Sequence, residues 1–299
     1  MKPVCVMMIV IVLASPASGQ IFGEKELFPI TRDGKCGYIN SKGEVKVEPT
    51  YQESRRFSEG LAAVKRDGLW GYIDTAAKVV VNPQYDEAFE FRDGYARVRM
   101  NKGFRGNFGF IDKEGKLVGP FKCDRAGDLS EGLAFADLDG DEKNQYGYVD
   151  SAGVVKILVQ FDDATDFSGG LARVKMGGKY GYIDTAGKIK INPTYANCDR
   201  FSEGLAPVEI DGKWGYIDKN GEVTIKPQFD AAAPFCESMG LVSIGGRRGY
   251  VRTSGQFVVS PRFDEARSFH DGLAAVRVGN LWGYIKPSGD WAIITQRFD

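Results

Sequence analysis

Residues 61–74 read Leu-Ala-Ala-Val-Lys-Arg-Asp-Gly-Leu-Trp-Gly-Tyr-Ile-Asp, and this stretch decides the fold. Two short apolar segments flank Asp67-Gly68, which is the signature of a type I′ β-hairpin because both turn positions need positive φ. A four-residue turn then leads to a third strand, Val79–Val81, which is ended by Pro83 because proline cannot donate to a β-ladder. The stretch predicts a three-stranded meander, followed by a connector that runs to Gly94.

The same pattern recurs along the chain. Its Gly-aromatic-Ile/Val centre begins at eight glycines that lie 34 or 38 residues apart: Gly37, Gly71, Gly109, Gly147, Gly181, Gly215, Gly249 and Gly283. Two or three strands are marginally stable alone, so such units bury their apolar faces by stacking on one another. The sequence therefore predicts an all-β protein, in which eight tandem β-meander repeats form one array.

An aromatic residue follows each of these glycines. The eight residues are Tyr38, Tyr72, Phe110, Tyr148, Tyr182, Tyr216, Tyr250 and Tyr284. Because a repeat fold needs its core somewhere and these are its largest side chains, we expect them to form an internal, structural aromatic ladder. The alternative is a solvent-exposed aromatic row on which sugars stack.

The chain resembles the WG-repeat family. The resemblance rests on Trp-Gly-Tyr-Ile-Asp at 70–74 and 214–218, with Gly-Leu-Ala before it and Pro-Gln-Tyr/Phe-Asp after it, and it covers residues 27–299. It implies a β-rich repeat with interaction roles and no catalytic residues. Cys36 and Arg248 depart from the pattern in the Trp position, and Ala77 departs from it in a turn that elsewhere ends in Gly. Near Arg248, Gly245-Gly246 replaces the usual hairpin dipeptide, so we expect a local distortion there.

Two architectures fit such an array. An open superhelical stack needs contacts between neighbours only and accepts any number of repeats. A closed eight-bladed β-propeller would also use eight units, but its blades have four strands and more residues. We therefore expect the open stack, with the propeller as the alternative.

The N-terminus resembles a secretory signal. Lys2 precedes the apolar run 4–13, and Ala17-Ser18-Gly19 offers small residues for cleavage before Gln20. We expect a signal peptide at 1–19, a linker at 20–26 and the array at 27–299, in a periplasmic or extracellular protein with no membrane span after cleavage. An uncleaved, membrane-anchored N-terminus is the alternative. The net charge of −1 gives no argument for a nucleic acid partner.

Little in the sequence points to catalysis. His270 is the only histidine and has no nucleophile at a recognisable spacing, and a metal site that needs several His or Cys ligands is excluded by their number. An aspartate recurs after the aromatic position in most repeats, which suits turn capping better than a single active site. We therefore expect a protein that is not an enzyme and has no cofactor. Cys198 and Cys236 are the one pair considered for a disulfide, against isolated buried thiols.

Two repeats carry four extra residues in the first hairpin turn, at 100–107 and 137–144. Insertions in repeat proteins gather on one face, often the binding face. The candidate binding residues are Lys102, Phe104, Arg105, Asp137, Asp139, Asp141 and Glu142. Three interpretations remain open: the two hairpins pair electrostatically with each other, they bind a partner around Phe104, or the alternate aspartates bind calcium.

The sequence thus favours an exported scaffold that mediates protein–protein interaction at the cell envelope or outside the cell. The alternative is a module that binds envelope or cell-wall glycans through its repeated aromatic residues.

Overall fold

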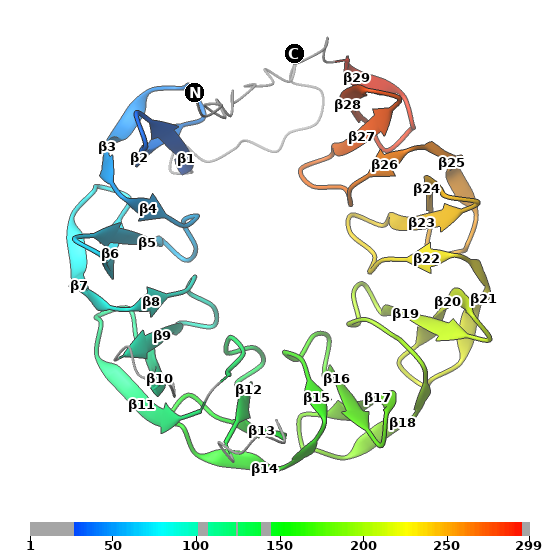
Figure 1. Ribbon diagram of the computed structural model, residues 1–299, viewed down its shortest axis with the longest axis horizontal. Helices are drawn as coiled ribbons and strands as arrows, with labels where there is room; N and C mark the ends of the chain where they lie inside the picture. The colour runs from blue at the N-terminus through cyan, green and yellow to red at the C-terminus, as the bar shows by residue number, and fades with distance from the viewer. Residues whose placement is uncertain (1–26, 101–106, 124, 139–144, 295–299) are drawn as a thin grey trace. The chain divides into compact units, whose positions relative to one another are not determined.

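The computed structural model describes residues 27–100, 107–123, 125–138 and 145–294, and the regular elements in these ranges are all β-strands (Figure 1). The expected signal peptide and linker lie outside them. By its internal contacts the chain divides into two compact units, Met1–Gly140 with Val149–Val155, and Asp141–Tyr148 with Lys156–Asp299. Within the described ranges, no helix is long and apolar enough to cross a membrane.

The described strands form eight antiparallel sheets, each with one Gly-aromatic motif. The first four sheets contain β1 (Leu27–Arg32), β2 (Lys35–Asn40) and β3 (Val45–Tyr51); β4 (Glu53–Ser54), β5 (Leu61–Arg66), β6 (Leu69–Asp74) and β7 (Val79–Tyr85); β8 (Glu87–Ala88), β9 (Ala96–Met100), β10 (Asn107–Ile111) and β11 (Leu117–Lys122); and β12 (Ala134–Asp137), β13 (Tyr146–Val149) and β14 (Val155–Phe161).

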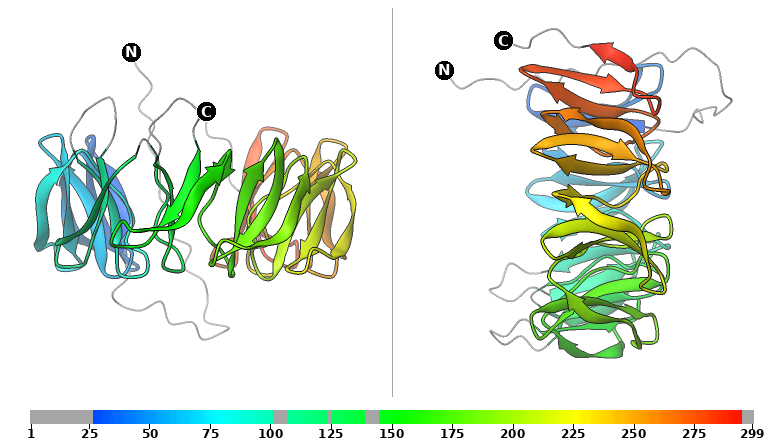
Figure 2. Two further views of the ribbon diagram at one scale, coloured as in Figure 1. Left: turned by 90° about the horizontal axis from the view of Figure 1, so that it is seen from below. Right: turned by 90° about the vertical axis from the view of Figure 1, so that its right-hand side faces the viewer.

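The other four sheets follow in chain order, as the right-hand view of Figure 2 shows from green to red. They contain β15 (Asp163–Ala164), β16 (Leu171–Met176), β17 (Lys179–Asp184) and β18 (Ile189–Tyr195); β19 (Leu205–Ile210), β20 (Lys213–Asp218) and β21 (Val223–Phe229); β22 (Ala231–Ala232), β23 (Gly240–Ile244), β24 (Arg247–Val251) and β25 (Phe257–Phe263); and β26 (Glu265–Ala266), β27 (Ala274–Val278), β28 (Leu281–Ile285) and β29 (Trp291–Ile294).

The first hairpin of the repeat forms as predicted. Strands β5 and β6 pair up to Arg66 and Leu69, and the two turn residues have φ of 52° at Asp67 and 83° at Gly68. The prediction of a local distortion at Gly245-Gly246 was wrong. Their φ values are 58° and 74°, and β23 pairs with β24 in unbroken register, because two glycines adopt the same turn as Asp-Gly without steric cost.

The connector differs from the expectation. Five sheets gain a two-residue strand from the connector that precedes the hairpin; in the second sheet, for example, Glu53 pairs with Lys65 and Ser54 with Val64. The hydrogen-bonded unit therefore begins in the connector, and five of the described sheets have four strands. Four strands is also the number in a propeller blade, so the strand count no longer separates the two expected architectures.

The core contains the aromatic position of the motif. The residues Tyr38, Tyr72, Phe110, Tyr148, Tyr182, Tyr216 and Tyr250 are at most 1% exposed, whereas Tyr284 is 39% exposed. Each buried tyrosine that follows a Gly meets a connector phenylalanine, as in Tyr216–Phe235 with ring centroids 4.8 Å apart. Its hydroxyl donates to a connector carbonyl, as from Tyr216 Oη to Ala233 O at 2.8 Å. Burial raises the pKa of these hydroxyls, and Tyr216 is an example.

The aspartates after the aromatic position cap turns, as predicted. Asp74 Oδ1 accepts the N–H of Ala76 and that of Lys78, each at 2.9 Å. Asp218 Oδ1 does the same for Asn220 and Glu222, and these bonds hold the pKa of its carboxyl below the ordinary value.

The cysteines of the described ranges are free thiols. Cys198 and Cys236, considered above as a pair, are both unbridged. Cys198 is buried, and burial raises the pKa of its thiol to about 11. A thiol with a raised pKa holds little thiolate, so Cys198 is a packing residue.

Candidate functional site

Most of the candidate binding residues lie outside the described ranges. They are Lys102, Phe104, Arg105, Asp139, Asp141 and Glu142, so the three interpretations of the long hairpins stay predictions. Asp137 is described and ends β12, where its backbone N–H donates to Arg125 O at 2.9 Å. It is 1% exposed, so its side chain lies within the repeat and not on a projecting turn.

A different surface is repeated along both units. We call it the strand-start row, because its members are the first residues of the long strand that follows the capped turn. They are Val79, Leu117, Val155, Ile189, Val223, Phe257 and Trp291, and each is between 36% and 47% exposed. The three-dimensional structure thus places an apolar, partly exposed side chain at the same position of seven repeats.

The exposure of the row follows from how neighbouring repeats meet. The regular alternation of side chains is interrupted between Val223, which pairs with Ile217, and Ile225, which pairs with Tyr216, because the register shifts there. Ile225 is 3% exposed because the turn of the next repeat covers it: a Cβ on Gly255 would lie 3.3 Å from its Cγ2. Val223 lies beyond that cover and is 47% exposed. Packing between repeats therefore leaves the strand start at the margin of the core.

The connector turns form a second repeated feature. In the sequence Phe-Ser-Glu-Gly-Leu, the serine Oγ donates to the equivalent phenylalanine carbonyl of the next connector, as from Ser202 to Phe235 O at 2.6 Å. The glutamate accepts a backbone N–H from that next turn, as Glu203 Oε2 does from Ser238 at 3.0 Å. Neighbouring connectors are thus tied to each other by side chains.

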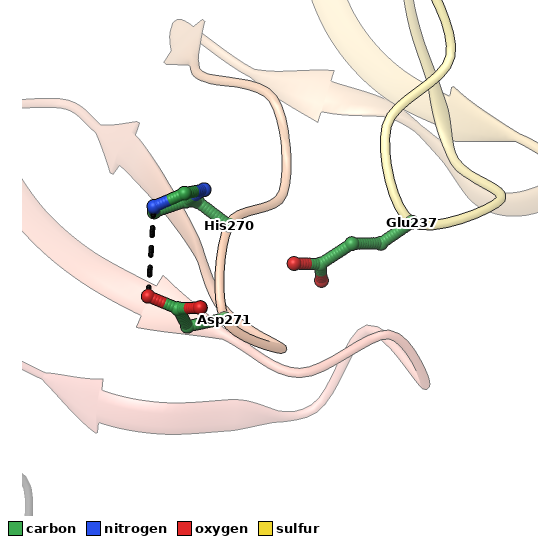
Figure 3. A group of neighbouring side chains, drawn as sticks. All are labelled: Glu237, His270 and Asp271. Atoms are coloured by element: carbon green, nitrogen blue, oxygen red, sulfur yellow. Dashed lines mark ion pairs between the residues drawn. The ribbon is translucent and has the colours of Figure 1, made fainter. Parts of the chain in front are cut away.

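The last of the described connector turns carries His270 in the serine position. His270 Nε2 lies 3.5 Å from Asp271 Oδ2, and Glu237 reaches toward both from the preceding connector (Figure 3). One potential ligand atom from each of the three side chains lies within 4.8 Å of the others, and all three are exposed. Sequence reasoning missed this group because it treated His270 alone. The signal was the alignment of repeats, which puts Glu237 and Asp271 in the same turn position.

The tryptophans of the motif are mostly covered. Trp70 is 5% exposed and stacks with Arg55, whose Cζ lies 5.3 Å from the centroid of the ring. Trp214 and Trp282 are half-buried. These rings do not offer the open faces that sugar stacking on every repeat would need.

Comparison with known families agrees with this repeat. A family model described as "WG containing repeat" matches residues 37–70, 70–104, 108–140, 146–180, 180–214, 214–247 and 249–282. The chain belongs to the WG-repeat family. Each of the seven matches begins at the motif Gly or at the residue before it, which is the Trp position. The repeat of the family is therefore the same length of chain as the structural repeat described above.

Solved structures are similar to this WG-repeat chain at low sequence identity. Kluyveromyces lactis Hsv2 with a complete loop 6CD is 12% identical, with a TM-score of 0.50 over 80% of this chain and 95% of that one. A structure titled "Structure of Dos1 propeller" is 13% identical, with a TM-score of 0.43 over 77% of this chain and 76% of that one. These likenesses concern the fold alone. No curated protein matches the chain.

Proposed function

We propose that this WG-repeat protein is an exported, non-catalytic scaffold that binds another protein through the strand-start row. The observation that supports it most is the partial exposure, from 36% to 47%, of an apolar side chain at one position in seven repeats. Contiguous exposed apolar surface rimmed by polar residues marks interaction sites in soluble proteins. A repeated position offers an extended partner the same contact several times.

The proposal includes the absence of catalysis. The recurring carboxylates, which are the most numerous candidates for acid–base chemistry, are engaged in turns: Asp74 and Asp218 each accept two backbone N–H groups. A carboxylate that recurs at the same turn in most repeats serves the fold. The long hairpins at 100–107 and 137–144 are proposed to select the partner by charge.

Export is proposed from the N-terminal sequence and places the partner in the periplasm or outside the cell. Mass spectrometry of the protein recovered from these fractions tests it. A mature chain that begins at Gln20 supports cleavage of residues 1–19, and a protein retained at full length in a membrane fraction contradicts it.

Affinity capture from the envelope fraction tests the binding proposal. The mature protein is compared with a row variant, Ile189→Glu with Val223→Glu, and with a control, Thr185→Glu with Gln228→Glu. Both variants add two negative charges at exposed positions of the same unit. Only the first variant replaces members of the strand-start row, so the control shows the effect of added charge outside the row. A third variant shortens both long hairpins to Asp-Gly.

The proposal predicts a partner that the control retains and the row variant loses. Loss with the shortened hairpins alone would move the site to repeats three and four. Equal capture by all folded variants contradicts binding through the row.

Glycan binding is a second candidate, favoured by one observation. Tyr284 and Trp291, both in the last described sheet, are 39% and 40% exposed. Titration with soluble cell-wall glycans, followed by tryptophan fluorescence, distinguishes the candidates. A saturable change that Trp291→Ala abolishes supports the glycan function, and an unchanged spectrum removes it.

A further inference from the structure

The exposed group Glu237, His270 and Asp271 lies on two consecutive connector turns of the second unit (Figure 3). Each turn is fixed by its backbone. Cys236 and Met239 exchange two hydrogen bonds of 3.0 Å, and His270 and Leu273 exchange two of 2.8 and 3.2 Å. The turn residues Glu237 and Asp271 have φ of 54° and 52°. The backbone therefore presents the three side chains from fixed positions.

Glu237 is oriented by the turn that carries His270. Its Oε2 accepts the N–H of Gly272 at 2.9 Å, which draws the carboxylate across from one connector to the next. This one hydrogen bond leaves further lone pairs of the carboxylate for a ligand, and one of its oxygens lies within 4.8 Å of ligand atoms of His270 and Asp271. A carboxylate held in this way pays little conformational entropy on binding an ion.

His270 departs from the pattern of its position. Ser58, Ser168 and Ser202 use their hydroxyls to reach the next connector at 2.6 to 2.8 Å. The side chain of His270 is instead 70% exposed, and its imidazole lies next to the carboxylate of Asp271. An imidazole in a serine position, open to solvent and next to two carboxylates, is suited to bind a cation from solution.

The charge of the group differs from that of the equivalent turn in the first unit. There, Glu59 is compensated by Lys113, whose Nζ lies 3.0 Å from Glu59 Oε2. Lys113 is the second residue of the capped turn in the repeat that follows Glu59, and the same position in the repeat that follows Glu237 is Pro287. Among the ion pairs of the described residues, neither Glu237 nor Asp271 has a lysine or arginine partner. Two carboxylates thus lack the ammonium that balances the equivalent site.

From these four observations we propose that Glu237, His270 and Asp271 bind a divalent transition-metal ion, with Zn²⁺ as the expected metal. One imidazole nitrogen and two carboxylate oxygens are ligands that Zn²⁺ accepts at about 2.0–2.2 Å. Ligand atoms now within 4.8 Å of one another reach such distances by rotation of exposed side chains. The ion supplies the positive charge that Lys113 supplies elsewhere, and links the two connectors. Its remaining coordination positions are open to water or to a ligand from a partner.

His270 is the only histidine of the sequence, so its imidazole gives the only histidine proton resonances in the NMR spectrum of a tag-free protein. A change in these resonances therefore reports on the proposed site. Zn²⁺ is titrated into the mature protein in a Cys236→Ser background, which removes the neighbouring half-buried thiol as a ligand. Isothermal titration calorimetry is run alongside. The test variants are His270→Ser, which restores the residue of other repeats, and Glu237→Gln, which keeps an oxygen for the Gly272 N–H.

The control variant is Glu203→Gln. Glu203 has the same turn position one repeat earlier and the same kind of backbone bond, but no histidine beside it. The proposal predicts that Zn²⁺ shifts the His270 resonances at one equivalent. It also predicts that His270→Ser and Glu237→Gln weaken binding about tenfold or more, as loss of a ligand does, while Glu203→Gln stays within about twofold.

Histidine resonances that Zn²⁺ leaves unmoved would overturn the proposal. So would binding that His270→Ser leaves intact, or equal losses for Glu203→Gln and Glu237→Gln. Thermal unfolding without metal confirms that each variant is folded. These outcomes are independent of partner capture, since the group lies apart from the strand-start row in the repeat.

Discussion

The buried tyrosine of each repeat joins its strand to its connector. In the second unit, Tyr182 donates to Asp199 O at 2.6 Å, Tyr216 to Ala233 O at 2.8 Å and Tyr250 to Arg267 O at 2.6 Å. The ring packs at the same time against the connector phenylalanine. One side chain therefore supplies both an apolar contact and a partner for a connector carbonyl that would otherwise be short of one.

Replacement of this tyrosine by phenylalanine removes the hydroxyl alone. For Tyr216→Phe we expect the free energy of unfolding to fall by about 1–2 kcal/mol, because Ala233 O loses its partner in a partly buried place. Urea unfolding followed by circular dichroism measures the change. The matched control is Tyr284→Phe at an aromatic position that is 39% exposed, where we expect a change within about 0.5 kcal/mol. Similar losses at both positions would show that the hydroxyl bond is unimportant.

The same tyrosines predict a loss of stability in alkali. Burial raises the pKa of the Tyr72, Tyr182 and Tyr216 hydroxyls in the folded protein, whereas in the unfolded chain they titrate near the ordinary value of about 10. Above that pH the unfolded chain releases protons that the folded protein keeps. The contribution is therefore fully present below about pH 10 and is lost as the pH rises further.

Urea unfolding between pH 8 and pH 11 measures this dependence. We expect a free energy of unfolding that falls above about pH 10, and a shallower fall in Tyr216→Phe, which removes one of the titrating groups. A free energy that stays level or rises over this range would contradict the burial of the hydroxyls.

At the scale of the element, the glycine of the motif lets the third strand approach the second. A Cβ on Gly215 would lie 2.5 Å from the carbonyl oxygen of Ile225 and 2.8 Å from the nitrogen of Pro227. The register between β20 and β21 shifts across this glycine, between Trp214 and Tyr216, and again between Tyr216 and Ile217, and the backbone of β21 passes directly over it. The requirement for glycine here is a close approach of backbone and not a turn.

Gly215→Ala is therefore expected to destabilise the protein by about 1–3 kcal/mol, because the strand must shift to admit a methyl group. The control is Gly212→Asn in the preceding hairpin, where φ is 76° and no atom lies within 4 Å of a Cβ. Asparagine tolerates this conformation, so we expect a cost below about 1 kcal/mol there. Equal costs, measured by chemical denaturation, would contradict the close approach.

The elements differ in how far the sequence predicts them. The Asp67-Gly68 hairpin and the aspartate-capped turns follow from local rules, because turn residues act on their own backbone. The prediction that Pro83 ends the third strand was wrong: β7 runs to Tyr85, and a register shift near Pro83 lets the strand continue past a residue that cannot donate. The short strand Glu53–Ser54 does not follow from local rules, since two residues carry no alternation and their partners, Lys65 and Val64, lie in the next hairpin.

The candidate surfaces were harder to predict from the sequence. The strand-start row depends on where the turn of the next repeat stops covering a strand, which is a property of packing. The group around His270 brings together Glu237 and His270, which lie 33 residues apart in the sequence. Both become visible in the sequence only after the repeats are aligned on one another and each turn position is compared.

At the scale of the whole molecule, function is expected to depend on repetition. Within each unit, neighbouring repeats contact one another through connector ties and turn-over-strand packing, and seven of the eight described sheets add one member to the strand-start row. A partially exposed aliphatic side chain contributes little to affinity alone. Several such contacts on one partner act together, since after the first contact the next ones form within the complex.

Site-specific photo-crosslinking tests the central claim, binding of a partner protein through the strand-start row, most directly. A photoreactive amino acid is placed in turn at 189, 223 and 257 in the row and at the exposed control positions 185 and 228, and the protein is irradiated in the native envelope fraction. We expect covalent adducts with one partner protein from the row positions and not from the controls. Adducts that form equally from the control positions, or that never include a row position, would contradict the claim.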